Sequence, residues 1–294
     1  MTLLESLASR RLILVTGKGG AGKSVLAATL GRLLAARGRR VLLLESDPRE
    51  SLYRYLGADP SGGGTVEVAK RLRLRNLDPR TVIDDLVRGA LPVPFLIGRV
   101  LRSPVYRHFV DGAPGLKEAA ALAHAVRQLG QRRGPDLVVF DAPATGHALA
   151  MLDAPPLLAD AVSTGPIGRM IEEVATFLDD GSAFAALVAG LAEGLATEET
   201  LELTEGLKAR RRRPAAVVVN ALYPPWIGAE PSDAAGKAWR RRRAAQQDSL
   251  DRLRAGWDGP VIELPLSRFE RDDELVSTLE PHLERGLRVP GATR

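Results

Sequence analysis

The glycine-rich stretch "VTGKGGAGKS" at residues 15–24 contains two lysines, and residues 17–24 fit the pattern G-x-x-x-x-G-K-[ST]. In such a loop the glycines let backbone N–H groups turn toward a triphosphate, and the following helix adds the positive end of its dipole. Lys23 is expected to reach the β- and γ-phosphates, and the Ser24 hydroxyl to ligate Mg²⁺. The pattern predicts a nucleotide-binding loop made of Gly17, Lys18, Gly19, Gly20, Ala21, Gly22, Lys23, Ser24 and Val25.

Two aspartates follow apolar runs that have the character of buried strands. Asp141 ends "DLVVFD", and a carboxylate at the end of a neighbouring strand can hold Mg²⁺ through water. Asp47 follows "RVLLLES" at the same expected sheet edge, where it can orient or deprotonate the attacking water. Either residue can also cap a helix or form a turn. The predicted metal site consists of Ser24, Asp47 and Asp141.

The elements that must position these residues alternate between strand and helix. An apolar run at 11–17, an amphipathic pattern from Lys23 to Arg37 that stops at Gly38, and a second apolar run at 40–47 form a βαβ unit. Further strands are expected at 136–141, 182–190, 214–220 and 260–265. The sequence predicts an α/β fold: one P-loop NTPase domain over 1–294, with a mostly parallel central sheet flanked by helices. Helical patterns at 78–134 and 150–181 are interpreted as insertions that form a helical subdomain.

The composition excludes several kinds of site. None of the 294 residues is cysteine, so disulfides, thiolate zinc sites and a cysteine nucleophile are impossible. This composition suits a reducing cytoplasm. The first ten residues show no secretory signal, and no apolar run approaches the ~20 residues that span a bilayer. We expect a soluble cytoplasmic protein.

Several motifs, in order, give the chain a resemblance to a known family. "KGGAGKS" is a deviant Walker A signature, and "DPRESL" and "DAPATGHALAMLDAP" resemble the switch loops of the ArsA and guided-entry ATPase family. The stretches "APGLKEAAAL", "GLATEETLEL" and "VVVNAL" match as well. The similarity runs along nearly the whole chain. It implies a cytoplasmic, Mg²⁺-dependent ATPase that works as a dimer, either a homodimer or a heterodimer with a paralogue.

The resemblance also implies roles for individual residues. Lys18, the second lysine of the loop, would cross the dimer interface and contact the phosphates bound by the other subunit; with Asp47 and Lys23 it forms the expected catalytic set. Asn220 would hydrogen-bond the adenine edge, and Pro265 and Leu266 would flank the base. The switch regions would fall at 47–52 and 141–147, where His147 has a structural or switch role.

The chain departs from the family pattern in two places. Arg49 and Glu50 precede Ser51 where the first switch commonly reads D-P-A-H followed by serine or asparagine. The absence of cysteine removes the zinc-binding Cys-x-x-Cys pair and the thiolate route for soft metals, so no zinc is expected.

The leading hypothesis is an ATP-hydrolysing dimeric switch that couples nucleotide state to a hydrophobic client or partner protein. The segment 92–109 is rich in apolar residues and can form the client groove, or it can simply pack against 150–180. One alternative is a positioning ATPase of the ParA and MinD type, acting on DNA or membrane. The basic runs at 208–213 and 239–243 are then DNA-binding candidates, although both also suit solvated faces, and the acidic to mixed last helix argues against a membrane anchor. A second alternative is a nucleotide sensor with negligible turnover. We expect neither nucleic-acid binding nor a stable membrane anchor.

Overall fold

The computed structural model confirms the expected α/β architecture. It describes residues 1–46, 49–90, 94–113, 115–142, 145–161, 164–227 and 233–290. Within these ranges eight strands form one sheet in the order β3-β4-β2-β5-β1-β6-β7-β8, and only β3 runs antiparallel to its neighbour. The strands are β1 Leu12–Gly17, β2 Val41–Glu45, β3 Thr65–Ala69, β4 Leu72–Asn76, β5 Leu137–Asp141, β6 Phe184–Leu191, β7 Ala216–Leu222 and β8 Val261–Pro265.

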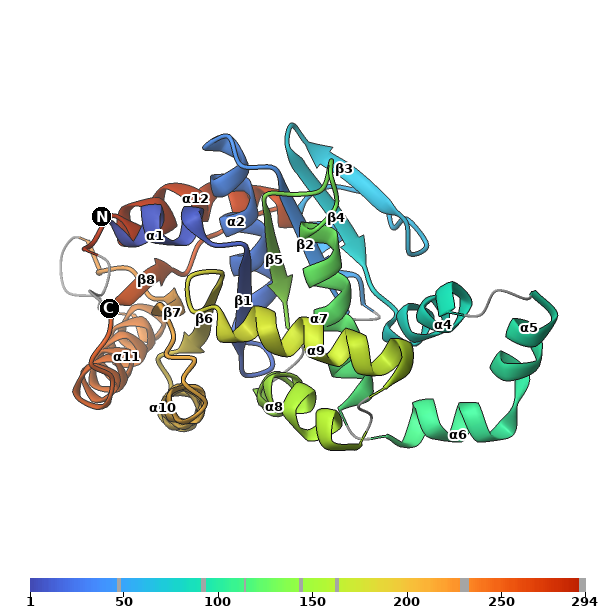
Figure 1. Ribbon diagram of the computed structural model, residues 1–294. Helices are drawn as coiled ribbons and strands as arrows, with labels where there is room; N and C mark the ends of the chain where they lie inside the picture. The colour runs from blue at the N-terminus through green and yellow to red at the C-terminus, as the bar shows by residue number, and fades with distance from the viewer. Residues whose placement is uncertain are drawn as a thin grey trace.

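Helices cover both faces of this sheet (Figure 1). One layer contains α1 Leu3–Ser9, α2 Lys23–Ala36, α3 Ser51–Tyr55 and α12 Asp272–Leu287. The other layer contains α7 Leu116–Leu129, α8 Thr145–Ala161, α9 Gly165–Asp179, α10 Gly194–Ala209 and α11 Ala234–Gly256. The central strand β1 serves both cores, because Leu12 and Leu14 face one layer while Ile13 and Val15 face the other. A parallel sheet that is buried on both faces explains why its strands read as continuous apolar runs.

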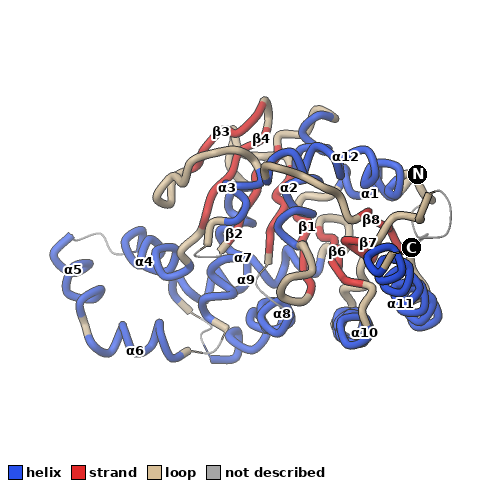
Figure 2. Tube along the Cα trace, turned by 180° about the vertical axis from the view of Figure 1, so that it is seen from behind, coloured by secondary structure: helices blue, strands red, loops and turns tan. Residues whose placement is uncertain are grey.

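The remaining helices extend the second layer sideways. They are α4 Pro79–Ala90, α5 Pro94–Arg102 and α6 Pro104–Gly112. Helix α4 packs against α7 and α9, whereas α5 and α6 reach away from the sheet in both views (Figure 1; Figure 2). The expected helical character of 78–134 and 150–181 agrees with these elements. In the described part of the chain, no helix has both the length and the apolarity needed to cross a bilayer.

The β3–β4 hairpin was not expected from the sequence. Its strands alternate between exposed and half-buried residues or carry arginines, so they lack the apolar runs that marked the other six. Strand β4 pairs with β2 and shields its outer edge, and β3 closes the sheet on that side. The glycine-rich stretch at 61–64 precedes β3, which begins at Thr65.

Candidate nucleotide-binding site

The glycine-rich loop connects β1 to α2 and has two positions where a side chain cannot fit. A Cβ added at Gly17 would lie 2.1 Å from the Ala189 carbonyl oxygen of β6. A Cβ added at Gly22 would lie 2.0 Å from the Asn220 side-chain nitrogen, and Gly22 has a left-handed φ of +87°. The strand packing and the turn into the helix thus both require glycine. The structure places the loop at the carboxyl edge of the sheet, as the pattern predicts.

Lys23 and Ser24, the basic and hydroxyl residues expected to bind phosphate and metal, lie at the start of α2. Lys23 is its first residue, and its Nζ donates to the Lys18 carbonyl oxygen at 3.1 Å, so the ammonium folds back over the loop. Ser24 follows in the first turn, and no side chain within the described residues caps this terminus. Val25 is buried in the core and can contribute only its backbone to a ligand. A 14-residue helix that begins in this way offers N–H groups and a positive dipole end to phosphate.

Asp141 lies where the metal prediction requires a carboxylate. It ends β5, in register with Val15 of β1 and Glu45 of β2, and is 5% exposed. Its position at the carboxyl end of the strand beside the loop fits a carboxylate that holds Mg²⁺ through water. Asp47, the third predicted metal residue, lies outside the described residues. The described residues contain no group of three His, Asp or Glu side chains that could hold a metal ion.

Glu45 is a second buried carboxylate at this edge, and sequence analysis missed it. It is fully buried at the end of β2, and its Oε2 accepts a hydrogen bond from the Leu52 N–H at 3.1 Å. This bond ties the end of the strand to the beginning of α3, across the first expected switch. An acidic residue ending an apolar run, as in "VLLLE", was the available signal.

The expected switch segments are only partly described. Residues 47–48 and 143–144 lie outside the described residues, as does the side chain of His147 in α8. In the first switch Glu50 takes a left-handed φ of 49° and accepts from the Asn76 side chain at 3.2 Å. The departure of this chain from D-P-A-H therefore introduces a residue that bonds β4.

Lys18 forms an ion pair within its own chain. Its Nζ lies 2.5 Å from Oε2 of Glu199 on α10, and the two side chains are 38% and 33% exposed. Ion pairs with this exposure stabilise a fold by less than about 1 kcal/mol. Lys18 can thus leave Glu199 at little cost in free energy. Glu199 lies in the "GLATEETLEL" motif, but its spacing along the chain gave no indication of this contact.

The residues expected to contact the adenine base lie together at the carboxyl edge of the sheet. The Asn220 Nδ2 donates to the Ala21 carbonyl oxygen of the loop at 3.5 Å, and its Oδ1 accepts from the Ala221 N–H at 2.9 Å. Pro265 pairs with Leu222, and the Leu266 N–H donates to the Leu222 carbonyl oxygen at 2.7 Å. The ends of β7 and β8 are therefore joined next to the phosphate loop.

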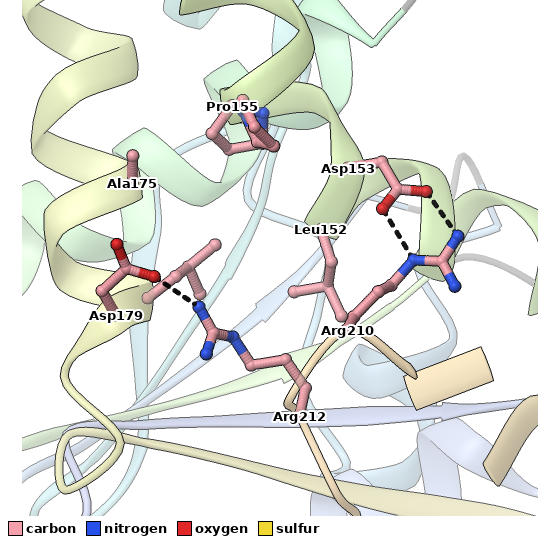
Figure 3. Close-up of a pocket in the computed structure, with 9 residues that line it drawn as sticks. Leu152, Asp153, Pro155, Ala175, Asp179, Arg210 and Arg212 are labelled. Carbon is pink, nitrogen blue, oxygen red and sulfur yellow. Dashed lines mark hydrogen bonds and ion pairs between the residues drawn. The ribbon is translucent and has the colours of Figure 1, made fainter. Parts of the chain in front are cut away.

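The basic run at 208–213 lies at the opposite, amino edge of the sheet, just before β7. It borders a surface hollow of about 290 Å³ between α8 and α9 (Figure 3). Arg210 forms two 2.6 Å hydrogen bonds with Asp153, and Arg212 contacts Asp179 at 3.0 Å. Arg213 pairs with Asp258 at 3.0 Å. The run therefore joins helices to the sheet and is not simply a solvated face.

Comparison with known proteins places these features in context. The family model for anion-transporting ATPases matches residues 10–172. The ATPase BagA of Mycobacterium tuberculosis is 31% identical over 90% of this chain and 78% of its own length. The ATPase get3 of Pyrenophora tritici-repentis is 27% identical over 67% of this chain and 58% of its own. The ATPase ASNA1 homolog 1 of Paramecium tetraurelia is 27% identical over 50% of this chain and 44% of its own.

Proposed function

The chain belongs to the anion-transporting ATPase family, and we propose that it binds Mg²⁺-ATP at the 17–24 loop and hydrolyses it to ADP and phosphate. The observation that carries this proposal is the loop geometry. Gly17 and Gly22 leave no room for a side chain, and the buried Asp141 lies on the strand beside them. Such a cradle presents N–H groups, an ammonium and a carboxylate to one small volume.

Each residue of the cradle has a distinct role in this reaction. Lys23 neutralises the β- and γ-phosphates, while Ser24 and Asp141 hold Mg²⁺, which supplies charge compensation when bound. Asp47 orients the attacking water and accepts its proton. Asn220, Pro265 and Leu266 receive the adenine. Lys18 acts on the nucleotide of the other subunit, where its cation stabilises charge on the transferring phosphoryl group.

We further propose that nucleotide-driven closure of a dimer controls the binding of a hydrophobic client or partner. Helices α5 and α6 support this proposal because they project from the body of the molecule and expose apolar side chains. Phe95 is 72% exposed and Val105 is 78% exposed. Most apolar residues of this size are buried, and their exposure on neighbouring helices is typical of an interaction surface.

Two observations disfavour a positioning ATPase that acts on DNA or membrane. The arginines at 210, 212 and 213 are paired with carboxylates of the same chain, so phosphate binding would have to break these contacts. The apolar face of α12 is buried against α1, α2 and β8 through Val276, Leu279, Leu283 and Leu287. A helix packed in this way has no apolar face left to insert into a bilayer.

Calorimetry with Mg²⁺-ATP tests the nucleotide assignment. Lys23→Ala should abolish measurable ATP binding, because it removes the phosphate-binding cation. Lys70→Ala, an exposed lysine in the β3–β4 turn, should bind as the wild type does. Asp47→Asn should keep ATP affinity but lose nearly all hydrolysis, because the amide cannot accept a proton. Equal affinities in the wild type and Lys23→Ala would refute the proposed site.

A further inference from the structure

The segment 220–224 spans the end of β7 and the residues after it, and one face of α11 holds it where its pairing with β8 is interrupted. The register between β7 and β8 shifts between Val219 and Leu222, so the ladder is interrupted at Asn220 and Ala221. Ala221 takes a left-handed φ of 57°, which is unusual for a residue with a side chain. A bulge of this kind redirects a side chain, and here it accompanies the contact of Asn220 with the phosphate loop.

Gln246 supplies hydrogen bonds to two backbone groups beside the interruption in the β7–β8 pairing. Its Oε1 accepts from the Tyr223 N–H at 2.8 Å, and its Nε2 donates to the Ala221 carbonyl oxygen at 3.1 Å. Gln246 is 9% exposed, so both bonds are largely shielded from water. One amide group therefore closes both sides of the left-handed turn. A backbone conformation that is unfavourable alone persists when its surroundings fix it in this way.

Other residues on the same face of α11 support this arrangement. The Trp239 indole N–H donates to the Pro224 carbonyl oxygen at 3.1 Å. The Trp239 and Tyr223 rings pack edge to face, with their centroids 4.5 Å apart. Arg243 donates to the Tyr223 carbonyl oxygen. Residues 239, 243 and 246 follow helical spacing, so the basic run at 239–243 faces this segment in part. Helix α11 lies beside β7 and β8 in both views (Figure 1; Figure 2).

We propose that Gln246 is a positioning residue for base recognition, acting by fixing the turn that aims Asn220. This inference rests on the proposed ATP site, in which Asn220 contacts the adenine edge. Gln246 itself bonds the backbone of Ala221 and Tyr223, so its proposed effect on the base is exerted through the turn. The triphosphate is held by residues 17–24, which Gln246 does not contact. Its loss should therefore weaken the recognition of the base much more than the binding of the phosphates, because Asn220 reaches the loop through a single 3.5 Å hydrogen bond.

The test compares Mg²⁺-ATP with Mg²⁺-tripolyphosphate, which lacks base and sugar. Gln246→Met keeps the length of the side chain but removes both hydrogen bonds. We expect it to weaken ATP binding about tenfold, because the turn that aims Asn220 loses both side-chain hydrogen bonds that fix it. Tripolyphosphate affinity should stay within about twofold of the wild type, and preference for ATP over GTP should fall. Gln247→Met is the matched control, because Gln247 is exposed on the same helix and bonds Asp251.

Each other outcome is informative. If Gln246→Met weakens ATP and tripolyphosphate equally, or neither, the positioning role is wrong. Wild-type protein that binds tripolyphosphate as tightly as ATP also overturns it, while the phosphate site stands. Wild-type protein that binds neither ligand overturns the ATP site itself.

Hydrogen exchange on the wild type covers the case in which the variant does not fold. The Tyr223 amide, bonded to buried Gln246, should exchange slowly without ligand. Its exchange should slow further with ATP and not with tripolyphosphate. An identical response to both ligands would contradict the inference.

Discussion

At the scale of single residues, local motifs predicted the place of the glycine-rich loop between β1 and α2, whereas long-range partners were unpredictable. Lys23, Ser24 and the glycines belong to one short pattern whose geometry follows from the backbone, and Asp141 follows from the strand that it ends. The ion pair of Lys18 with Glu199 joins residues far apart in the chain. Such a contact depends on the packing of α10 against the sheet, about which the spacing of the motifs carries no information.

His124 on α7 provides a prediction about pH. Burial, together with the positive charges of Arg75 and Arg127, lowers the pKa of His124 from 6.5 to about 4, and Asp85 opposes this only in part. An unfolded chain therefore binds the proton more readily. The free energy of unfolding should be greatest above about pH 6.5 and fall as the pH drops toward 4. Between pH 7.5 and 5 the loss due to this group should be about 2 kcal/mol.

Urea unfolding of His124→Gln at these two pH values checks the expectation. The variant should show a smaller difference in unfolding free energy between pH 7.5 and pH 5 than the wild type. His108→Gln, at an exposed position of α6, controls for the removal of an imidazole as such. The comparison uses the change with pH within each protein, so a general loss of stability in the variant does not affect it. Equal changes with pH in the wild type and His124→Gln would contradict the assignment.

At the scale of elements, the order of strands and helices could be predicted because a parallel sheet buried on both faces imposes long apolar runs. The six strands read from such runs are present, with boundaries shifted by one to two residues at most ends. The β3–β4 hairpin was not predicted because "TVEVA" and "LRLRN" carry charges on their less buried faces. Edge strands often carry such charges, which discourage pairing with other chains.

Helices α5 and α6 are the elements whose environment should depend most on nucleotide. They make their main contacts with each other and with α4, and both expose large apolar side chains. Hydrogen exchange of residues 94–112 should therefore differ between the ADP state and a state with a non-hydrolysable ATP analogue. The β3 strand Thr65–Ala69, also largely exposed but on another part of the molecule, serves as the control segment. Slow and identical exchange of 94–112 in both states would mean that the segment is static, and the client proposal would lose its site.

At the scale of the whole molecule, the proposed reaction needs two chains. The position of Lys18 in the single chain is compatible with a role at an interface between them. Lys18 is at the rim of the loop in a half-exposed pair with Glu199, so it can leave that partner for phosphates across an interface. Lys23, in contrast, folds over its own loop, where it would bind the nucleotide of its own subunit. In the proposed dimer the two lysines of the glycine-rich loop would thus serve two different active sites.

Mixing two inactive variants tests this division directly. Lys18→Ala keeps Lys23, and Lys23→Ala keeps Lys18, so each variant alone should form dimers without a complete site. A mixed dimer contains one complete site, with Lys23 from one subunit and Lys18 from the other. In an equal mixture half of the dimers are mixed and each has one of its two sites intact, so hydrolysis should return to about a quarter of the wild-type rate.

Two controls establish that the recovered hydrolysis requires Lys18 from the partner subunit. Lys18→Ala mixed with a Lys18→Ala, Lys23→Ala double variant should stay inactive, because no subunit then supplies Lys18. Light scattering should show a dimer for the mixture when Mg²⁺ and a non-hydrolysable ATP analogue are present. If the mixture forms dimers yet recovers no hydrolysis, Lys18 acts within its own chain. A wild-type protein that hydrolyses ATP as a strict monomer would exclude the shared site altogether, since the catalytic cation could then come only from the subunit that binds the nucleotide.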